Sequence, residues 1–67
     1  MEKYFVIWRE FDAVFLGRLL KGSYSMSPEG LVTVRTPSGS KTTHLGRSPA
    51  IFVAKRLLRE LAAEGKA

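Results

Sequence analysis

The sequence contains no cysteine and only one histidine. The missing thiols exclude a disulfide framework, a thiolate zinc site and a cysteine nucleophile. One imidazole, on His44, is too few for a histidine-rich metal centre. Long apolar runs are also missing, because 4–8 has only five residues and Gly17 and Arg18 interrupt 13–20. Neither stretch approaches the about 18 residues of a membrane span or the roughly 7–15 of a signal-peptide core. We therefore expect a cytoplasmic protein that binds no metal, cofactor or membrane.

Acidic residues are scarce, with six Asp and Glu against eleven Lys and Arg. None stands between Gly30 and Arg59, so His44 has no nearby carboxylate in the sequence to orient it as a general base. The carboxylates cluster near the two ends and in one turn, which offers no obvious pair for acid–base catalysis. We expect no catalytic residues, a protein that is not an enzyme, and a structural or surface role for His44.

The 67 residues suit one small domain, 1–67. Aromatic and β-branched residues over 4–8 predict a first strand. The apolar residues of 13–21 predict a second strand that continues past a bulge or bend at Gly17. Phe11 and Asp12 are then expected to form a tight reversal between the two strands.

Two proline-containing turns divide the middle of the chain. Segments 27–30 and 36–39 both place Pro second and Gly fourth, as a type I turn prefers. The β-rich residues 31–36 lie between these turns, and 41–45 follow the second. The pattern predicts an antiparallel meander of three or four strands.

A helix is predicted at the C-terminus, with Ser48 as its N-cap, Pro49 in its first turn and Gly65 as its stop. Helical spacing gathers one apolar stripe, formed by Ala50, Val53, Ala54, Leu57, Leu58 and Leu61. We expect an α+β fold in which this stripe packs across one face of the meander.

Positive charge is concentrated in the middle of the chain. The whole sequence carries +5, but residues 13–59 alone carry +7. Such asymmetry is typical of a surface that follows phosphates. The residues predicted to contact nucleic acid are Arg35, Lys41, Arg47, Phe52, Lys55, Arg56 and Arg59.

Helical geometry places Lys55, Arg56 and Arg59 opposite the apolar stripe, with Phe52 in the same sector. Phe52 is then suited to stack on a base or to insert between base steps. In the alternative interpretation the basic face is only solvated, and Phe52 packs under the first strand or in a dimer contact. In the sheet, Arg35 shares a strand face with Thr33 and Lys41 with Thr43, but the sequence does not determine whether these two faces coincide.

The first fifteen residues hold more apolar bulk than one small core accommodates, and an exposed surplus of this kind is typical of association surfaces. The competing hypothesis is therefore a protein-interaction module, which forms a homodimer or binds a protein partner. Its interface would be the N-terminal residues Tyr4, Phe5, Ile7 and Trp8.

Residues 22–62 also resemble a group of small uncharacterised bacterial proteins. The shared pattern is G-S-Y at 22–24, V-T-V at 32–34, G-S-K-x-T at 39–43 and L-G-x-S-P at 45–49. The resemblance implies no activity, ligand or cofactor.

Overall fold

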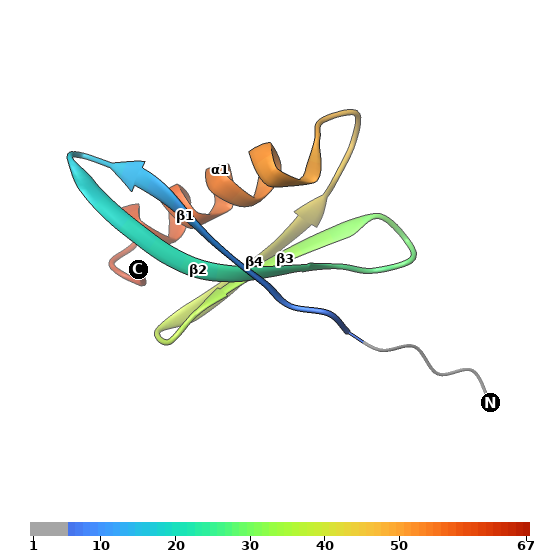
Figure 1. The fold of residues 1–67 in the computed structure, drawn as a ribbon, viewed down its shortest axis with the longest axis horizontal. Helices are drawn as coiled ribbons and strands as arrows, with labels where there is room; N and C mark the ends of the chain where they lie inside the picture. The colour runs from blue at the N-terminus through green and yellow to red at the C-terminus, as the bar shows by residue number, and fades with distance from the viewer. Residues whose placement is uncertain (1–5) are drawn as a thin grey trace.

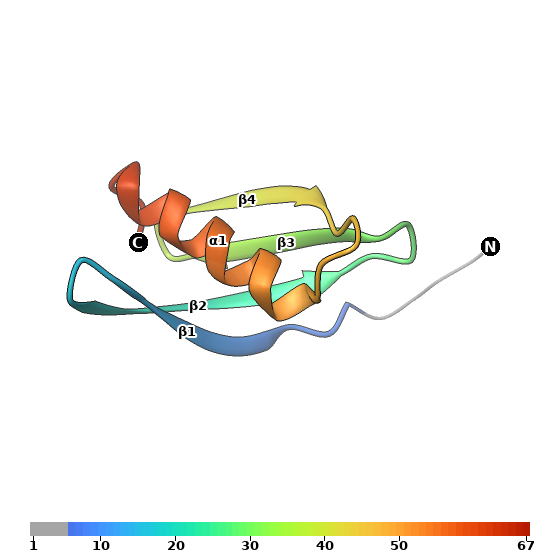
Figure 2. The same cartoon turned by 90° about the horizontal axis from the view of Figure 1, so that it is seen from above.

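The computed structural model describes residues 6–67. It contains one antiparallel sheet of four strands, in the spatial order β1-β2-β3-β4, followed by one helix. The elements are β1 (Arg9–Phe15), β2 (Arg18–Met26), β3 (Leu31–Thr36), β4 (Gly39–His44) and α1 (Ala50–Ala63). Helix α1 lies diagonally across one face of the sheet, as Figures 1 and 2 show. The predicted α+β meander with a C-terminal helix is confirmed.

The core lies between α1 and the sheet. Five of the six residues of the predicted stripe are buried, whereas Ala50 is half-buried. Phe11 and Tyr24 border this core edge to face, with ring centroids 5.2 Å apart. The buried residues are Ala13, Leu20, Val32, Val34, Val53, Ala54, Leu57, Leu58 and Leu61. Because α1 covers only one face, no helix of residues 6–67 lies over the opposite face of the sheet (the outer face).

Both predicted turns are present. The Gly30 amide donates to the Ser27 carbonyl at 3.1 Å, and the positive φ of Gly30, 82°, favours glycine there. Thr36 and Gly39 pair across the second turn. These two reversals connect β2 to β3 and β3 to β4.

The prediction for the first half of the sheet was wrong. Phe11 and Asp12 do not reverse the chain but lie within β1. The reversal falls at Leu16 and Gly17. These two residues were predicted to lie inside a strand, with a bulge or bend at Gly17. Leu16 and Gly17 both have positive φ, 52° and 76°, as the two central residues of a type I′ hairpin turn require. Leucine is a poor residue for this conformation, so local preference does not predict the turn here.

The predicted N-terminal strand over 4–8 is also not present in 6–8, the part of it that the structure describes. Residues 6–8 belong to no strand, and Tyr4 and Phe5 lie outside the described residues. Ile7 is exposed, whereas Trp8 is half-buried.

The helix begins one residue later than predicted. Pro49, not Ser48, occupies the N-cap position, and no side chain caps the first turn. The other end follows the prediction, because Gly65 adopts a φ of 79° directly after the C-cap. The Gly65 amide donates to the Ala62 carbonyl and the Lys66 amide to the Leu61 carbonyl, which is the Schellman pattern.

Candidate nucleic-acid interface

The outer surface of α1 brings together four of the predicted contact residues. Phe52, Lys55, Arg56 and Arg59 are three or four positions apart on the helix, so their side chains are neighbours on one face. Phe52 is 64% exposed, and Lys55 is half-buried. The exposure of Phe52 excludes the alternative in which this ring packs beneath another part of the described chain. We refer to Phe52, Lys55, Arg56 and Arg59 as the helix patch.

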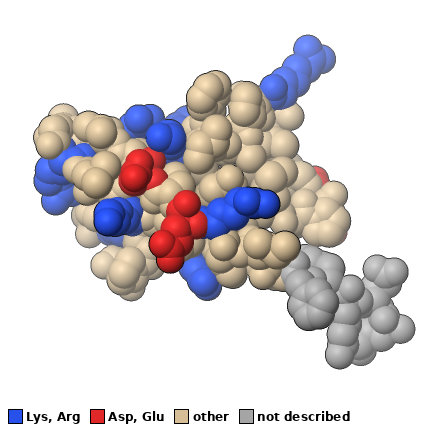
Figure 3. Space-filling view, viewed as in Figure 1, with Lys and Arg blue, Asp and Glu red and all other residues tan. Residues whose placement is uncertain are grey.

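Most of the positive charge around the helix patch is not neutralised within the described part of the chain. No carboxylate there lies within ion-pair distance of Arg47, Lys55 or Arg59. Arg56 has one distant partner, with its Nε 3.9 Å from Glu60 Oε2. This pair is exposed and contributes little to stability. Figure 3 shows Lys and Arg side chains distributed over the molecule on this view, with acidic side chains among them.

Arg59 also has a structural contact. Its Nε donates a hydrogen bond of 3.0 Å to the carbonyl oxygen of Val14 in β1. β1 is an edge strand, and the Val14 carbonyl points away from β2, towards this open edge. Arg59 therefore holds α1 to the edge of the sheet, and the rest of its exposed guanidinium stays accessible to an anion.

Lys41 does not belong to the helix patch. It pairs with Val34 across β3 and β4, on the side of the sheet that faces α1. Its Nζ lies 2.5 Å from Glu64 Oε2 and 3.3 Å from Glu60 Oε1. The hydrogen bond with Glu64 raises the pKa of Lys41 and lowers the pKa of Glu64. Two carboxylates therefore already occupy this ammonium group.

Arg35 lies on the opposite side of the molecule. The register pairs it with Ser40, so that Arg35 points to the outer face while Lys41 points towards α1. The Arg35 guanidinium carbon lies 3.7 Å above the Trp8 ring, in a cation–π contact. The two strand faces that the sequence left undetermined therefore do not coincide.

Arg47 is exposed in the loop that leads into α1, close in sequence to Phe52. The first-turn amides of α1 have no side-chain cap, so Arg47 and the helix N-terminus present positive charge in the same region. The structure thus groups five of the seven predicted residues around α1 and places Arg35 on the opposite face. Lys41 also lies beside α1, but Glu60 and Glu64 bind its ammonium group.

Sequence reasoning did not identify two features. The first is the pairing of Lys41 with Glu60 and Glu64. The i,i+4 spacing of the two glutamates places them on one flank of a helix, but that Lys41 is their partner follows only from the strand register. The exposed apolar residues at the β1–β2 turn were assigned to a strand interior. The Leu16-Gly17 dipeptide between two strand-like runs was the available signal for a hairpin.

Within residues 6–67, no group of His, Asp and Glu side chains is arranged to hold a metal ion. No helix in this described part is long and apolar enough to cross a membrane. A surface hollow of about 390 Å³ lies away from the helix patch and is lined by Glu10, Asp12, Lys21 and Ser23 with the backbone between them.

Compared with protein-family models, with curated proteins and with solved structures, the chain gives no match.

Proposed function

We propose that the protein is a nucleic-acid-binding module, without catalytic activity, that acts in the cytoplasm and contacts phosphates through the helix patch and Arg47. The observation that carries this proposal is the exposure of Phe52 among Lys55, Arg56 and Arg59. A large apolar ring in water gains nothing for the fold, whereas it gains a stacking partner on an exposed base.

The roles of these residues differ. Lys55, Arg56, Arg59 and Arg47 supply charge to the phosphates, which gives affinity without sequence preference. Phe52 supplies an apolar face that every base can stack on, worth about 1–3 kcal/mol per base. Together they suit a single strand or a locally opened duplex better than an intact, fully stacked duplex.

Fluorescence anisotropy with a labelled, mixed-sequence single strand, and with its duplex, tests the proposal. We expect Arg56→Gln to weaken binding to every sequence alike and to lower the salt slope by about 1, as loss of one phosphate contact does. Arg35→Gln is the matched control, because it makes the same charge change on the outer face. If Arg35→Gln weakens binding and Arg56→Gln does not, the helix patch is not the interface.

Phe52→Ala isolates the stacking contribution. We expect it to weaken binding to the single strand about tenfold or more, which corresponds to about 1.4 kcal/mol. Because Phe52 is exposed, the free energy of unfolding should change by less than about 0.5 kcal/mol. Phe52→Trp retains a ring and should bind like the wild type. Equal binding by Phe52→Ala and Phe52→Trp would contradict the stacking role.

A second candidate function is a protein-interaction module that uses the N-terminal segment. Its support is the exposure of Val6 and Ile7, beside the exposed Met26 of β2. Trp8 is less available, since Arg35 covers its ring. An apolar interface should be almost indifferent to salt, whereas phosphate binding weakens steeply as salt rises. Ile7→Glu should abolish such an interaction and leave nucleic-acid binding unchanged.

A further inference from the structure

The end of the β1–β2 hairpin exposes three large apolar side chains. Val14 is 60% exposed, Leu16 85% and Leu19 59%. Val14 and Leu19 are direct partners across the two strands. They alternate with the buried pair Ala13 and Leu20, so they point away from α1 to the outer face. The turn that carries Leu16 lies at one end of the molecule in both Figure 1 and Figure 2.

Leu16 occupies a position that disfavours leucine. Its φ of 52° is in the left-handed region, where the side chain crowds the backbone, and asparagine is the preferred residue at this point of a type I′ turn. The side chain gains almost no burial within the chain in return. Backbone strain combined with exposure indicates that this side chain serves a contact outside the monomer.

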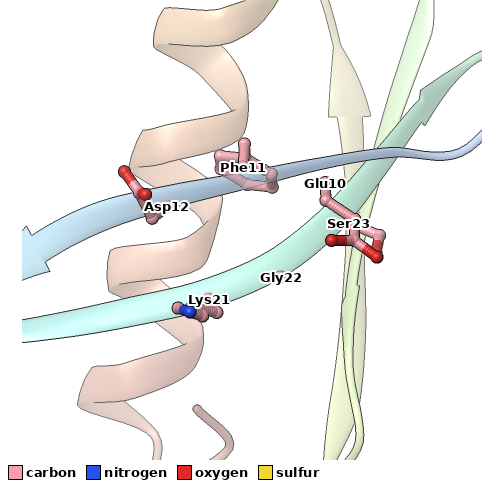
Figure 4. Close-up of a pocket in the computed structure, with 6 residues that line it drawn as sticks. All are labelled: Glu10, Phe11, Asp12, Lys21, Gly22 and Ser23. Atoms are coloured by element: carbon pink, nitrogen blue, oxygen red, sulfur yellow. The ribbon is translucent and has the colours of Figure 1, made fainter.

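The outer face of the hairpin is complementary to itself. From the middle of the hairpin to its end, the register places Glu10 opposite Ser23, Asp12 opposite Lys21 and Val14 opposite Leu19. In each of these three pairs one interacting side chain lies on β1 and the other on β2, so the two strands are complementary to each other. Figure 4 shows the first two pairs around the hollow of about 390 Å³ on this face.

We propose that the outer face of the β1–β2 hairpin binds a second copy of this chain, face to face. A half-turn about an axis along the hairpin places β1 of one copy over β2 of the other. Val14 then meets Leu19 of the second copy, and the Asp12 carboxylate meets Lys21 of the second copy. The same rotation brings Glu10 to the Ser23 hydroxyl. Every contact occurs twice, as a two-fold interface requires.

The chemistry of the surface agrees with this occupant. On the outer face Trp8 lies against Arg35 of β3, whereas Val14 and Leu19 of the β1–β2 hairpin are exposed. Val14, Leu16 and Leu19 supply an apolar patch at the end of the hairpin, and Asp12 and Lys21 supply charged contacts beside it. Asp12 and Lys21 each find an opposite charge on a second copy, whereas an anionic lipid surface would repel Asp12.

A charge exchange tests the proposal directly. Wild type should sediment as a monomer–dimer equilibrium below about 0.5 mM, whereas Asp12→Lys and Lys21→Asp should each dimerise at least tenfold more weakly, because like charges then face each other across the interface. An equimolar mixture of the two variants should recover wild-type dimerisation as a heterodimer. In each variant the like charges also face each other across β1 and β2 of the same chain. This repulsion within the chain persists in the mixture. Recovery therefore reports only on contacts between chains.

Two further variants complete the test. Leu16→Asn should weaken dimerisation at least tenfold while the monomer stays folded by circular dichroism. Ile7→Ser should leave dimerisation unchanged, since Ile7 lies outside the proposed interface. A monomeric wild type at about 0.5 mM, no recovery on mixing, or loss of the dimer in Ile7→Ser would each overturn the proposal. None of these measurements involves nucleic acid, so the outcome does not depend on the proposed function.

Discussion

Replacing Leu16 by asparagine should stabilise the monomer. An L-residue in the left-handed region costs about 1–2 kcal/mol, and asparagine tolerates that region far better than leucine does. Burying a whole leucine contributes about 1.5–3 kcal/mol, so the 15% of Leu16 that is not exposed contributes only about 0.2–0.5 kcal/mol. We therefore expect Leu16→Asn to raise the free energy of unfolding by about 1 kcal/mol.

For a domain of this size, about 1 kcal/mol raises Tm by roughly 4–8 °C. Urea unfolding followed by circular dichroism, at two low micromolar protein concentrations, measures the change without a contribution from association. The urea dependence of the free energy (the m value) should stay unchanged, because the exposed surface is almost the same.

Leu19→Asn is the matched control, because it makes the same substitution three residues away in β2. Leu19 has an ordinary strand conformation and pairs with Val14, so the substitution removes a cross-strand apolar contact worth about 0.2–1 kcal/mol. We expect it to destabilise the protein. If Leu16→Asn destabilises the protein as well, the turn is not strained and this reasoning is refuted.

Two further predictions concern stability. The hydrogen bond with Lys41 lowers the pKa of Glu64 below 4.5, so this pair stabilises the fold above pH 4.5, and its contribution is lost as the pH falls through the folded-state pKa. Glu64→Gln should therefore flatten the fall in stability below pH 4.5 in urea unfolding, and an unchanged profile would contradict the pairing. Gly22→Ala should destabilise by about 1–3 kcal/mol, because the new methyl group would lie 3.1 Å from Leu58 Cδ1 in a packed core. In Gly39→Ala the new methyl group meets only a flexible lysine side chain, so equal losses in the two variants in thermal unfolding would contradict the close packing at Gly22.

The sequence was most informative where residue chemistry acts locally. Pro28 and Pro37 fix φ at the second position of their turns, and the structure has both reversals where the sequence predicted them. The apolar stripe of α1 repeats at helical spacing, so the buried face could be predicted without knowledge of the sheet. Gly65 likewise ends the helix through its own conformational freedom.

The sequence was least informative where tertiary context decides the structure. Leu16 adopts a conformation that leucine rarely adopts, so the first hairpin was divided incorrectly. Arg35 and Lys41 lie on opposite faces because of the strand register, which depends on pairing between segments rather than on either segment alone. The same register directs Lys41, one of the predicted phosphate contacts, to Glu60 and Glu64.

The most direct test of the proposed function is an amide NMR titration of the labelled protein with a mixed-sequence single strand and with its duplex, at low and at moderate salt. We predict that the shifts lie within 47–59, around the helix patch, that they weaken as salt rises, and that β4 stays unperturbed because the carboxylates of α1 already occupy Lys41. No shifts at low salt, or shifts confined to the outer face around Arg35, would contradict nucleic-acid binding through the helix patch.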